Sequence, residues 1–396
     1  MGMLERGQIN QIQLFALVML FTLGDTLLVV PGYTAMIAGR DGWLSGMLSV
    51  SMGMGVLLLY AALQRRNPAR TLVQICQSRL GRWAGSIAAS IYVFGFLLLL
   101  SASMVRVLTD FMSTQIMPNT PVQVIALLFL VLVVRAARGG IETIARTAEI
   151  SAPWVMLLLG LLVMFVIPES HIDRIQPFLY NGVKPVIAGS LTFLAYGFIE
   201  TGSFLMIFPF VRGGERGLRK PLLLGGAAGG TLLVAIIFFC LTVFGPGITA
   251  SSTYPSYMLA KKIEIGEFLQ RIEAIMAIAW LFTIFFKLTL SFYGICLGAA
   301  QMFKLSDYKL FTFPLALLLL VMSDLLAPNI IAINNSAQHY PWFDMTIVVG
   351  GTLLLLAVGW LKDKRGAVGG PQSIHAEGER ASDAAKEVPS GEDADR

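Results

Sequence analysis

Residues 12–38 read IQLFALVMLFTLGDTLLVVPGYTAMIA and form the first long apolar run of the chain. A run of this length can cross a bilayer as one helix. Gly24 and Asp25 interrupt it at its midpoint, where the glycine lowers helix propensity and the carboxylate is costly at membrane depth. Pro31 weakens the second half again. A helix with a charge beside a central break more often lines a site than faces lipid, so the run predicts a discontinuous transmembrane helix.

The composition of the whole chain is that of a membrane protein. Of its 396 residues, 56% are hydrophobic and only 13% are charged, which is about half the charged fraction of soluble domains. Mean hydropathy is +0.73. The basic residues are spread through the short loops between apolar runs, as in cytoplasmic loops, and do not suggest a nucleic-acid surface. We therefore expect an all-α polytopic protein that lies in the lipid bilayer and binds no nucleic acid.

Apolar runs predict about ten transmembrane helices in a permease-like domain of residues 1–361. The predicted spans are roughly 11–38, 43–63, 83–111, 121–135, 141–167, 186–211, 219–244, 268–302, 310–327 and 343–361. If the N-terminus is inside, most Lys and Arg residues fall in inside segments, which places both termini in the cytoplasm. The outside segments hold only Arg40, Arg174, Lys184, Lys261, Lys262 and Arg271. Residues 362–396 are polar and predict a disordered cytoplasmic tail.

A second interruption lies in the sixth predicted span. Its centre reads YGFIETG at 196–202, and Glu200 is the only charged residue between 186 and 211. The first and sixth spans thus both carry a central glycine near a carboxylate. Matching interruptions in the two halves of a transporter-like chain indicate an inverted repeat with a site near the membrane midplane. Five spans followed by five have the opposite orientations that such a repeat requires.

Asp25 and Glu200 are the leading candidates for a binding site. Unwound backbone at each break would expose amides and carbonyls that can hold a polar ligand. The alternative is a buried hydrogen bond or ion pair that only holds the helices together. The cost of a charge at the midplane favours the site.

Lys287 lies in the middle of the eighth span, in LFTIFFKLTLSF. It is too deep to reach the interface easily and needs a carboxylate or carbonyl partner. Two hypotheses remain open. In the first, the Lys287 ammonium occupies the place where a sodium-coupled protein holds a cation. In the second, Lys287 forms a structural ion pair with Asp25 or Glu200. Both predict that Lys287 lies near the two broken helices.

The remaining sequence patterns argue against an enzyme and a metal site, and one of them concerns helix packing. The sequence has no nucleophile elbow, HExxH or Walker motif, so we expect no enzyme. The cysteines and histidines are isolated, and we expect neither a metal site nor a cofactor. Two overlapping GxxxG patterns at 225–230 predict close helix packing.

Several short motifs together resemble the spore germination permease family, the B subunits of germinant receptors in the amino acid–polyamine–organocation superfamily. The resemblance covers about residues 10–361. Its pieces are TLGDTLLVVPG (22–32), DGWLS (41–45), LGRWAGS (80–86), PFLYNGVKPVIAGSL (177–191), TYPS (253–256) and RIEAIMAIAW (271–280).

This resemblance implies a LeuT-like fold with a 5+5 inverted repeat and broken helices 1 and 6. It also implies recognition of a small germinant, commonly an amino acid, in the spore inner membrane. The implied partners are a germinant receptor A subunit and a lipoprotein C subunit. Carried over by position, the substrate-binding residues would be Gly24, Asp25, Thr26, Phe96, Gly197, Phe198, Ile199, Glu200 and Lys287.

One departure from the family pattern concerns Asp25, because many relatives have a small residue there. A fixed negative charge would oppose a ligand carboxylate and favour an ammonium, unless Lys287 neutralises it. The expected germinant is an amino acid or an amine, and Asp25 makes an amine-bearing or uncharged ligand an alternative to the usual pose of an amino acid. The alternative function is a secondary amino acid transporter, either an exchanger or proton-coupled through Glu200. A third possibility is a scaffold whose charges are purely structural.

Overall fold

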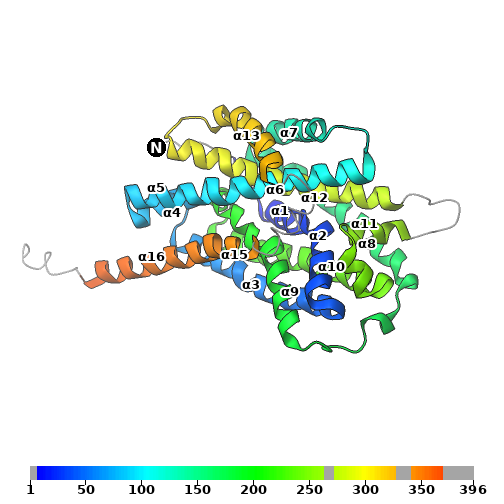
Figure 1. Cartoon of the computed structure of the whole chain (residues 1–396). Helices are drawn as coiled ribbons and strands as arrows, with labels where there is room; N and C mark the ends of the chain where they lie inside the picture. The colour runs from blue at the N-terminus through cyan, green and yellow to red at the C-terminus, as the bar shows by residue number, and fades with distance from the viewer. Residues whose placement is uncertain (1–6, 263–271, 327–339, 369–396) are drawn as a thin grey trace, which may run out of the picture.

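The computed structural model is a bundle of helices and describes residues 7–262, 272–326 and 340–368. Most of the long helices run across the view in Figure 1, with α16 projecting from one end of the bundle. Among the described residues, eight helical stretches are long and apolar enough to cross a membrane. The chain is therefore a multi-pass membrane protein of the all-α class, as its composition predicts.

The first half of the chain contains the first break, which lies between its first two helices. They are α1 (Gln11–Leu23), α2 (Thr26–Ala38), η1 (Gly39–Asp41), α3 (Gly42–Arg66), α4 (Leu72–Leu80), α5 (Arg82–Ser90), η2 (Ile91–Leu97), α6 (Leu98–Phe111), η3 (Met112–Ile116), α7 (Val122–Arg138) and α8 (Gly140–Val166).

The second half supplies the second break and the helix that joins the two breaks. Its elements are η4 (Ile167–Glu169), η5 (Ile172–Ile175), α9 (Val183–Leu194), η6 (Ala195–Ile199), η7 (Glu200–Met206), η8 (Phe208–Phe210), α10 (Gly214–Ser251), α11 (Pro255–Lys262), α12 (Ile272–Met302), η9 (Tyr308–Phe311), α13 (Thr312–Leu326), α15 (Tyr340–Asp344), η10 (Met345–Gly350) and α16 (Gly351–Val368).

The C-terminal end of the described chain is helical for longer than the sequence suggests. α16 continues through Val368, so residues 362–368 of the predicted tail are helical. The rest of that tail, 369–396, lies outside the described residues, as do 268–271 of the predicted eighth span and residue 327 of the ninth.

The centre of the bundle is α1, which packs against α8, α10 and α12. All its residues from Leu14 to Leu23 are buried except Phe15. A capping box starts the helix: the Asn10 side chain accepts from the Gln13 amide at 2.8 Å, and the Gln13 side chain accepts from the Asn10 amide at 2.9 Å. α1 is therefore a core element whose position all its neighbours fix.

Glycines on α10 let the backbone of α1 come close. A β-carbon added at Gly225 would lie 2.7 Å from the Phe15 carbonyl oxygen, and one at Gly229 would lie 3.0 Å from that of Met19. Gly230, on the adjoining face, packs against Val50 of α3 and the Phe198 ring. The close packing predicted from the two GxxxG patterns is confirmed, because any larger side chain on this face would separate the helices.

The proline in α2 has a specific compensation. Pro31 has no amide hydrogen, so it cannot donate to the carbonyl of Leu27 one turn earlier. The Ser256 hydroxyl on α11 donates to that carbonyl at 2.7 Å. A freed backbone group inside the bundle is thus satisfied by a neighbouring helix, which is how membrane helices tolerate proline.

Candidate functional site

The first helix is broken at Gly24 and Asp25. α1 ends at Leu23, Gly24 adopts φ +21° and ψ −130°, and α2 begins at Thr26. A β-carbon at Gly24 would collide with the aliphatic part of Lys287. Glycine is therefore required here both for the backbone conformation and for the close approach of α12.

The sixth helix unwinds at the matching place. α9 passes into the wider turns of η6 and then into the tighter turns of η7, which begins at Glu200. Side chains from other helices bind the carbonyls of this segment: the Tyr60 hydroxyl donates to Ile199 at 2.9 Å and the Tyr92 hydroxyl to Gly202 at 2.7 Å. These two carbonyls of the irregular backbone are thus satisfied by side chains inside the bundle.

The two breaks meet at the Tyr196 carbonyl. The Thr26 hydroxyl donates to this oxygen at 3.2 Å, and the Gly24 carbonyl accepts from the Thr283 hydroxyl of α12 at 3.2 Å. At the ends of the broken helices, Ile9 and Val211 form a parallel bridge in which the Ile9 amide donates to the Phe210 carbonyl at 2.9 Å. A side-chain hydrogen bond at the breaks and a backbone bridge at the helix ends therefore couple the two broken helices at two levels.

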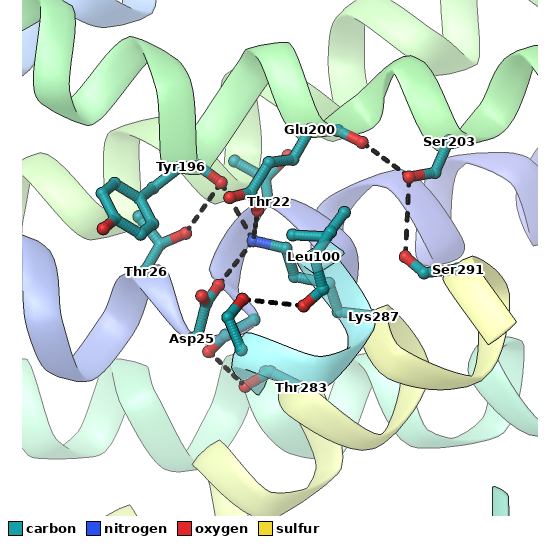
Figure 2. A network of polar contacts seen from close by, with 12 residues as sticks. Thr22, Asp25, Thr26, Leu100, Tyr196, Glu200, Ser203, Thr283, Lys287 and Ser291 are labelled. Atoms are coloured by element: carbon teal, nitrogen blue, oxygen red, sulfur yellow. Dashed lines mark hydrogen bonds and ion pairs between the residues drawn. The ribbon is translucent and has the colours of Figure 1, made fainter. Parts of the chain in front are cut away.

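Lys287 of α12 joins both breaks through its side chain (Figure 2). The ammonium donates to Asp25 Oδ1 at 2.5 Å and to the Tyr196 carbonyl at 2.9 Å, and it forms an ion pair with Glu200. Lys287 and Glu200 are both 0% exposed, and Asp25 is 3% exposed. Since an ammonium has three donors, these contacts use all of them. One cation thus holds together the first break, the sixth helix and α12.

Two aromatic residues complete the surroundings of this cluster. The Lys287 ammonium lies 5.3 Å from the centre of the Phe21 ring, a distance at which the ring face attracts a cation. The Tyr340 hydroxyl of α15 donates to Glu200 Oε1 at 3.0 Å. The cluster of Asp25, Tyr196, Glu200, Lys287 and Tyr340 is called the lysine network below.

The structure brings most of the sequence-predicted site residues together. Gly24, Asp25, Thr26, Glu200 and Lys287 all belong to the contacts just described. Both hypotheses for Lys287 predict this proximity, and the ammonium pairs with both carboxylates rather than with one.

The other predicted residues lie in the packing around this network. A β-carbon at Gly197 would come 2.8 Å from the Phe193 ring and 3.9 Å from Thr26, so this glycine lets the sixth helix approach the first. Phe198 directs its ring against Gly53 of α3 and Gly230 of α10. Phe96 and Ile199 are buried at 1% exposure.

Sequence patterns alone do not identify two residues of the site, Tyr340 and Asp344. Asp344 is fully buried beside the network. A carboxylate in an apolar helix could have indicated Asp344. However, Asp344 lies next to the predicted start of the tenth span, and a charge at the end of a span is expected to lie at the membrane–water interface. In the structure the chain is already helical at Tyr340, so Asp344 lies at least one turn inside the helix. The role of Tyr196 had no sequence signal, because it acts through its backbone carbonyl.

Comparison with known families identifies the chain. A family model described as "Spore germination protein" matches residues 8–331. The chain belongs to the spore germination protein family. Its relatives include spore germination protein KB of Bacillus subtilis (strain 168), 27% identical over 332 residues that cover 82% of this chain and 87% of that protein. Spore germination protein GerLB of Bacillus cereus is 25% identical over 336 residues, again covering 82% and 87%.

Solved structures show the fold of this spore germination protein. A nucleobase–cation-symport-1 family transporter, closed with bromovinylhydantoin bound, superposes with a TM-score of 0.66 at 9% identity, covering 88% of this chain and 77% of that one. A Na⁺-coupled sialic acid symporter in a substrate-bound outward-open state gives 0.60 at 12% identity, covering 86% and 79%. Both have the LeuT fold, so the predicted family and fold are confirmed. The family is transporter-like and not one of enzymes.

Proposed function

We propose that this chain is the membrane-embedded B subunit of a germinant receptor, and that a small germinant binds where the two helix breaks meet. The observation that carries the proposal is the bridging position of Lys287, whose ammonium contacts Asp25 of the first break and both Tyr196 and Glu200 of the sixth helix. A ligand that competes for any of these groups changes how the two broken helices are joined.

The network offers partners for both charged ends of an amino acid. A ligand ammonium fits the acceptors that Lys287 now uses, namely the two carboxylates and the Tyr196 carbonyl. A ligand carboxylate fits the Lys287 ammonium. Because Lys287 neutralises Asp25, the aspartate does not by itself exclude an amino acid carboxylate, and the germinant class is an amino acid or an amine.

Binding produces a signal if the germinant prefers one arrangement of the helices. A ligand shifts a conformational equilibrium only by its difference in affinity for the two states. In the arrangement described here, Lys287 is bound to both breaks. A germinant that draws Lys287 away from Asp25 or Glu200 favours a second arrangement, in which α12 is released from one of them.

The membership of the family supports a set of partners and a place in the cell. We propose that the chain assembles with an A subunit and a lipoprotein C subunit in the spore inner membrane. The distribution of Lys and Arg supports cytoplasmic placement of both termini.

Spores that carry single substitutions test the site. Asp25→Asn and Glu200→Gln should each lower the germination response at normal protein abundance, because each removes one acceptor of the network. Glu142→Gln is the matched control, since Glu142 is partly exposed near the start of α8 and forms a local ion pair with Arg146, away from the network. An unchanged response in both network variants contradicts the site.

The alternative is a secondary transporter, and two observations favour it: the superposition on two symporters and a buried ionisable network at the helix breaks. Uptake of labelled amino acids into liposomes that contain only this protein separates the two functions. Saturable uptake without partner subunits contradicts a pure receptor. Ligand-dependent thermal stabilisation of the purified protein contradicts a scaffold that binds nothing.

A further inference from the structure

A third buried carboxylate, Asp344, lies beside the lysine network. Asp344 is the last residue of α15 and is 0% exposed. Neither of its oxygens has a hydrogen-bond partner of ordinary geometry within the described ranges. Tyr340, one helical turn earlier, lies close to Asp344 but directs its hydroxyl hydrogen to Glu200. An ionised carboxylate that is buried without hydrogen-bond donors is strongly unfavourable. The charge of Asp344 must therefore be balanced by a nearby cation or removed by a proton.

Among the described residues, the groups that surround Asp344 carry too little positive charge to compensate its own negative charge. Asp25, Glu200 and Lys287 are near enough to interact with Asp344 electrostatically, so one ammonium faces three carboxylates. The three donors of Lys287 are already used by Asp25, Tyr196 and Glu200. The surrounding elements also carry the phenols of Tyr60 on α3, Tyr92 on η2, Tyr196 on η6 and Tyr340 on α15. Their cationic side chains, Lys184 on α9 and Arg65 and Arg66 at the end of α3, are exposed.

A metal ion does not fit the arrangement. Across residues 7–262, 272–326 and 340–368, no three His, Cys, Asp or Glu side chains are placed to hold one. A proton needs neither a set of ligands nor additional space. It also converts one Asp344 oxygen from an acceptor into a donor.

We propose that Asp344 is a proton-binding site, which holds a proton in this arrangement of the helices. The protonated carboxyl donates to the Tyr340 hydroxyl oxygen, and Tyr340 in turn donates to Glu200. The chain of hydrogen bonds then runs from Asp344 through Tyr340 and Glu200 to Lys287. Release of the proton leaves Asp344 ionised and competing with Asp25 and Glu200 for the single ammonium.

The consequence is a link between pH and the helix breaks. An ionised Asp344 attracts Lys287 and weakens its contact with Asp25, so proton release favours separation of α12 from the first break. This proposal goes beyond the germinant site, because it holds whether or not a germinant binds at Lys287. It also assigns the proton to Asp344 and not to Glu200, because Glu200 contacts the Lys287 ammonium and accepts from Tyr340, whereas Asp344 has neither contact.

Infrared spectroscopy of the purified protein tests the proposal directly, because protonated and ionised carboxyl groups absorb at different frequencies. At neutral pH, the wild-type protein should show a protonated-carboxyl band. The band should be lost in Asp344→Asn and kept in Glu200→Gln. It should also be kept in Asp363→Asn, the matched control on the exposed end of α16. Absence of the band in wild type, or its full persistence in Asp344→Asn, overturns the proposal.

The pH dependence of stability gives a second measurement. The folded state holds a proton that the unfolded carboxyl releases at neutral pH, so stability falls as the pH rises. The melting temperature of wild type should fall more steeply between about pH 6 and about pH 9 than that of Asp344→Asn, which cannot lose this proton. Equal slopes overturn the proposal. If Asp344→Asn does not fold, the presence or absence of the infrared band in wild type and in Glu200→Gln tests the proposal by itself. Either result leaves the proposal of a germinant site at Lys287 unaffected.

Discussion

Replacing Lys287 by methionine removes the ammonium that pairs with both Asp25 and Glu200. Loss of one partner of a buried ion pair costs about 3–5 kcal/mol, because the other charge stays buried without compensation. The two stranded carboxylates can instead take up protons. At pH 7 this costs about 4 kcal/mol for each group, starting from an ordinary carboxyl pKa of about 4. We therefore expect Lys287→Met to lower the free energy of unfolding by about 3–8 kcal/mol.

The pH dependence of this loss identifies its cause. At pH 5, proton uptake costs only about 1.4 kcal/mol for each carboxylate, so the difference between wild type and Lys287→Met should shrink. Thermal unfolding of the purified wild type and Lys287→Met in detergent at both pH values measures this difference in stability. At about 2 °C for each kcal/mol, a loss of about 3–8 kcal/mol lowers the melting temperature at pH 7 by roughly 6–16 °C.

Two further variants make the test specific. Combining Lys287→Met with Asp25→Asn and Glu200→Gln should recover most of the stability, because the amides need no counter-charge. Lys184→Met is the matched control, since Lys184 is exposed at the start of α9, and it should melt like wild type. A wild-type melting temperature for Lys287→Met, or a triple variant no more stable than it, refutes the reasoning.

Three other substitutions test how the broken helices are held. Gly24→Ala should lower the melting temperature and the germination response, because the backbone conformation at Gly24 disfavours a β-carbon and that carbon would overlap Lys287. A wild-type germination response in Gly24→Ala would contradict this prediction. Ser256→Ala leaves the Leu27 carbonyl without its donor and should cost about 1–3 kcal/mol in thermal unfolding, whereas Ser256→Thr should cost less. Gly225→Ala should destabilise the protein by pushing α1 from α10, while Gly160→Ala, with open space at its β-carbon, should not; equal effects would show that the close approach is unimportant.

The position of both helix breaks is predictable from local sequence. Gly24 next to Asp25 combines a poor helix former with a charge, and the same combination recurs at Gly197 and Glu200. A buried lysine must also find an acceptor, so Lys287 is recognisable as a partner of the breaks. These inferences hold because the cost of a charge in an apolar environment depends little on the details of the fold.

The limits of the sequence show at Asp344 and Phe198. The sequence places Asp344 at the membrane–water interface, because the residue lies near the predicted end of a span. A difference of one helical turn decides whether such a carboxylate reaches water or is buried. Phe198 belongs to the interrupted segment, yet its ring packs against glycines of α3 and α10. The direction of a side chain in irregular backbone follows from dihedral angles that no periodic pattern predicts.

The sequence alone therefore determined the membrane class, the helix breaks and the need of Lys287 for an acceptor, since each follows from the cost of placing polar groups in an apolar environment. Only the tertiary structure decided that one ammonium serves Asp25, Tyr196 and Glu200 together, and that Asp344 and Tyr340 adjoin them. The reason is geometric. These groups come from helices far apart in the chain, and their distances are set by how closely the helices pack.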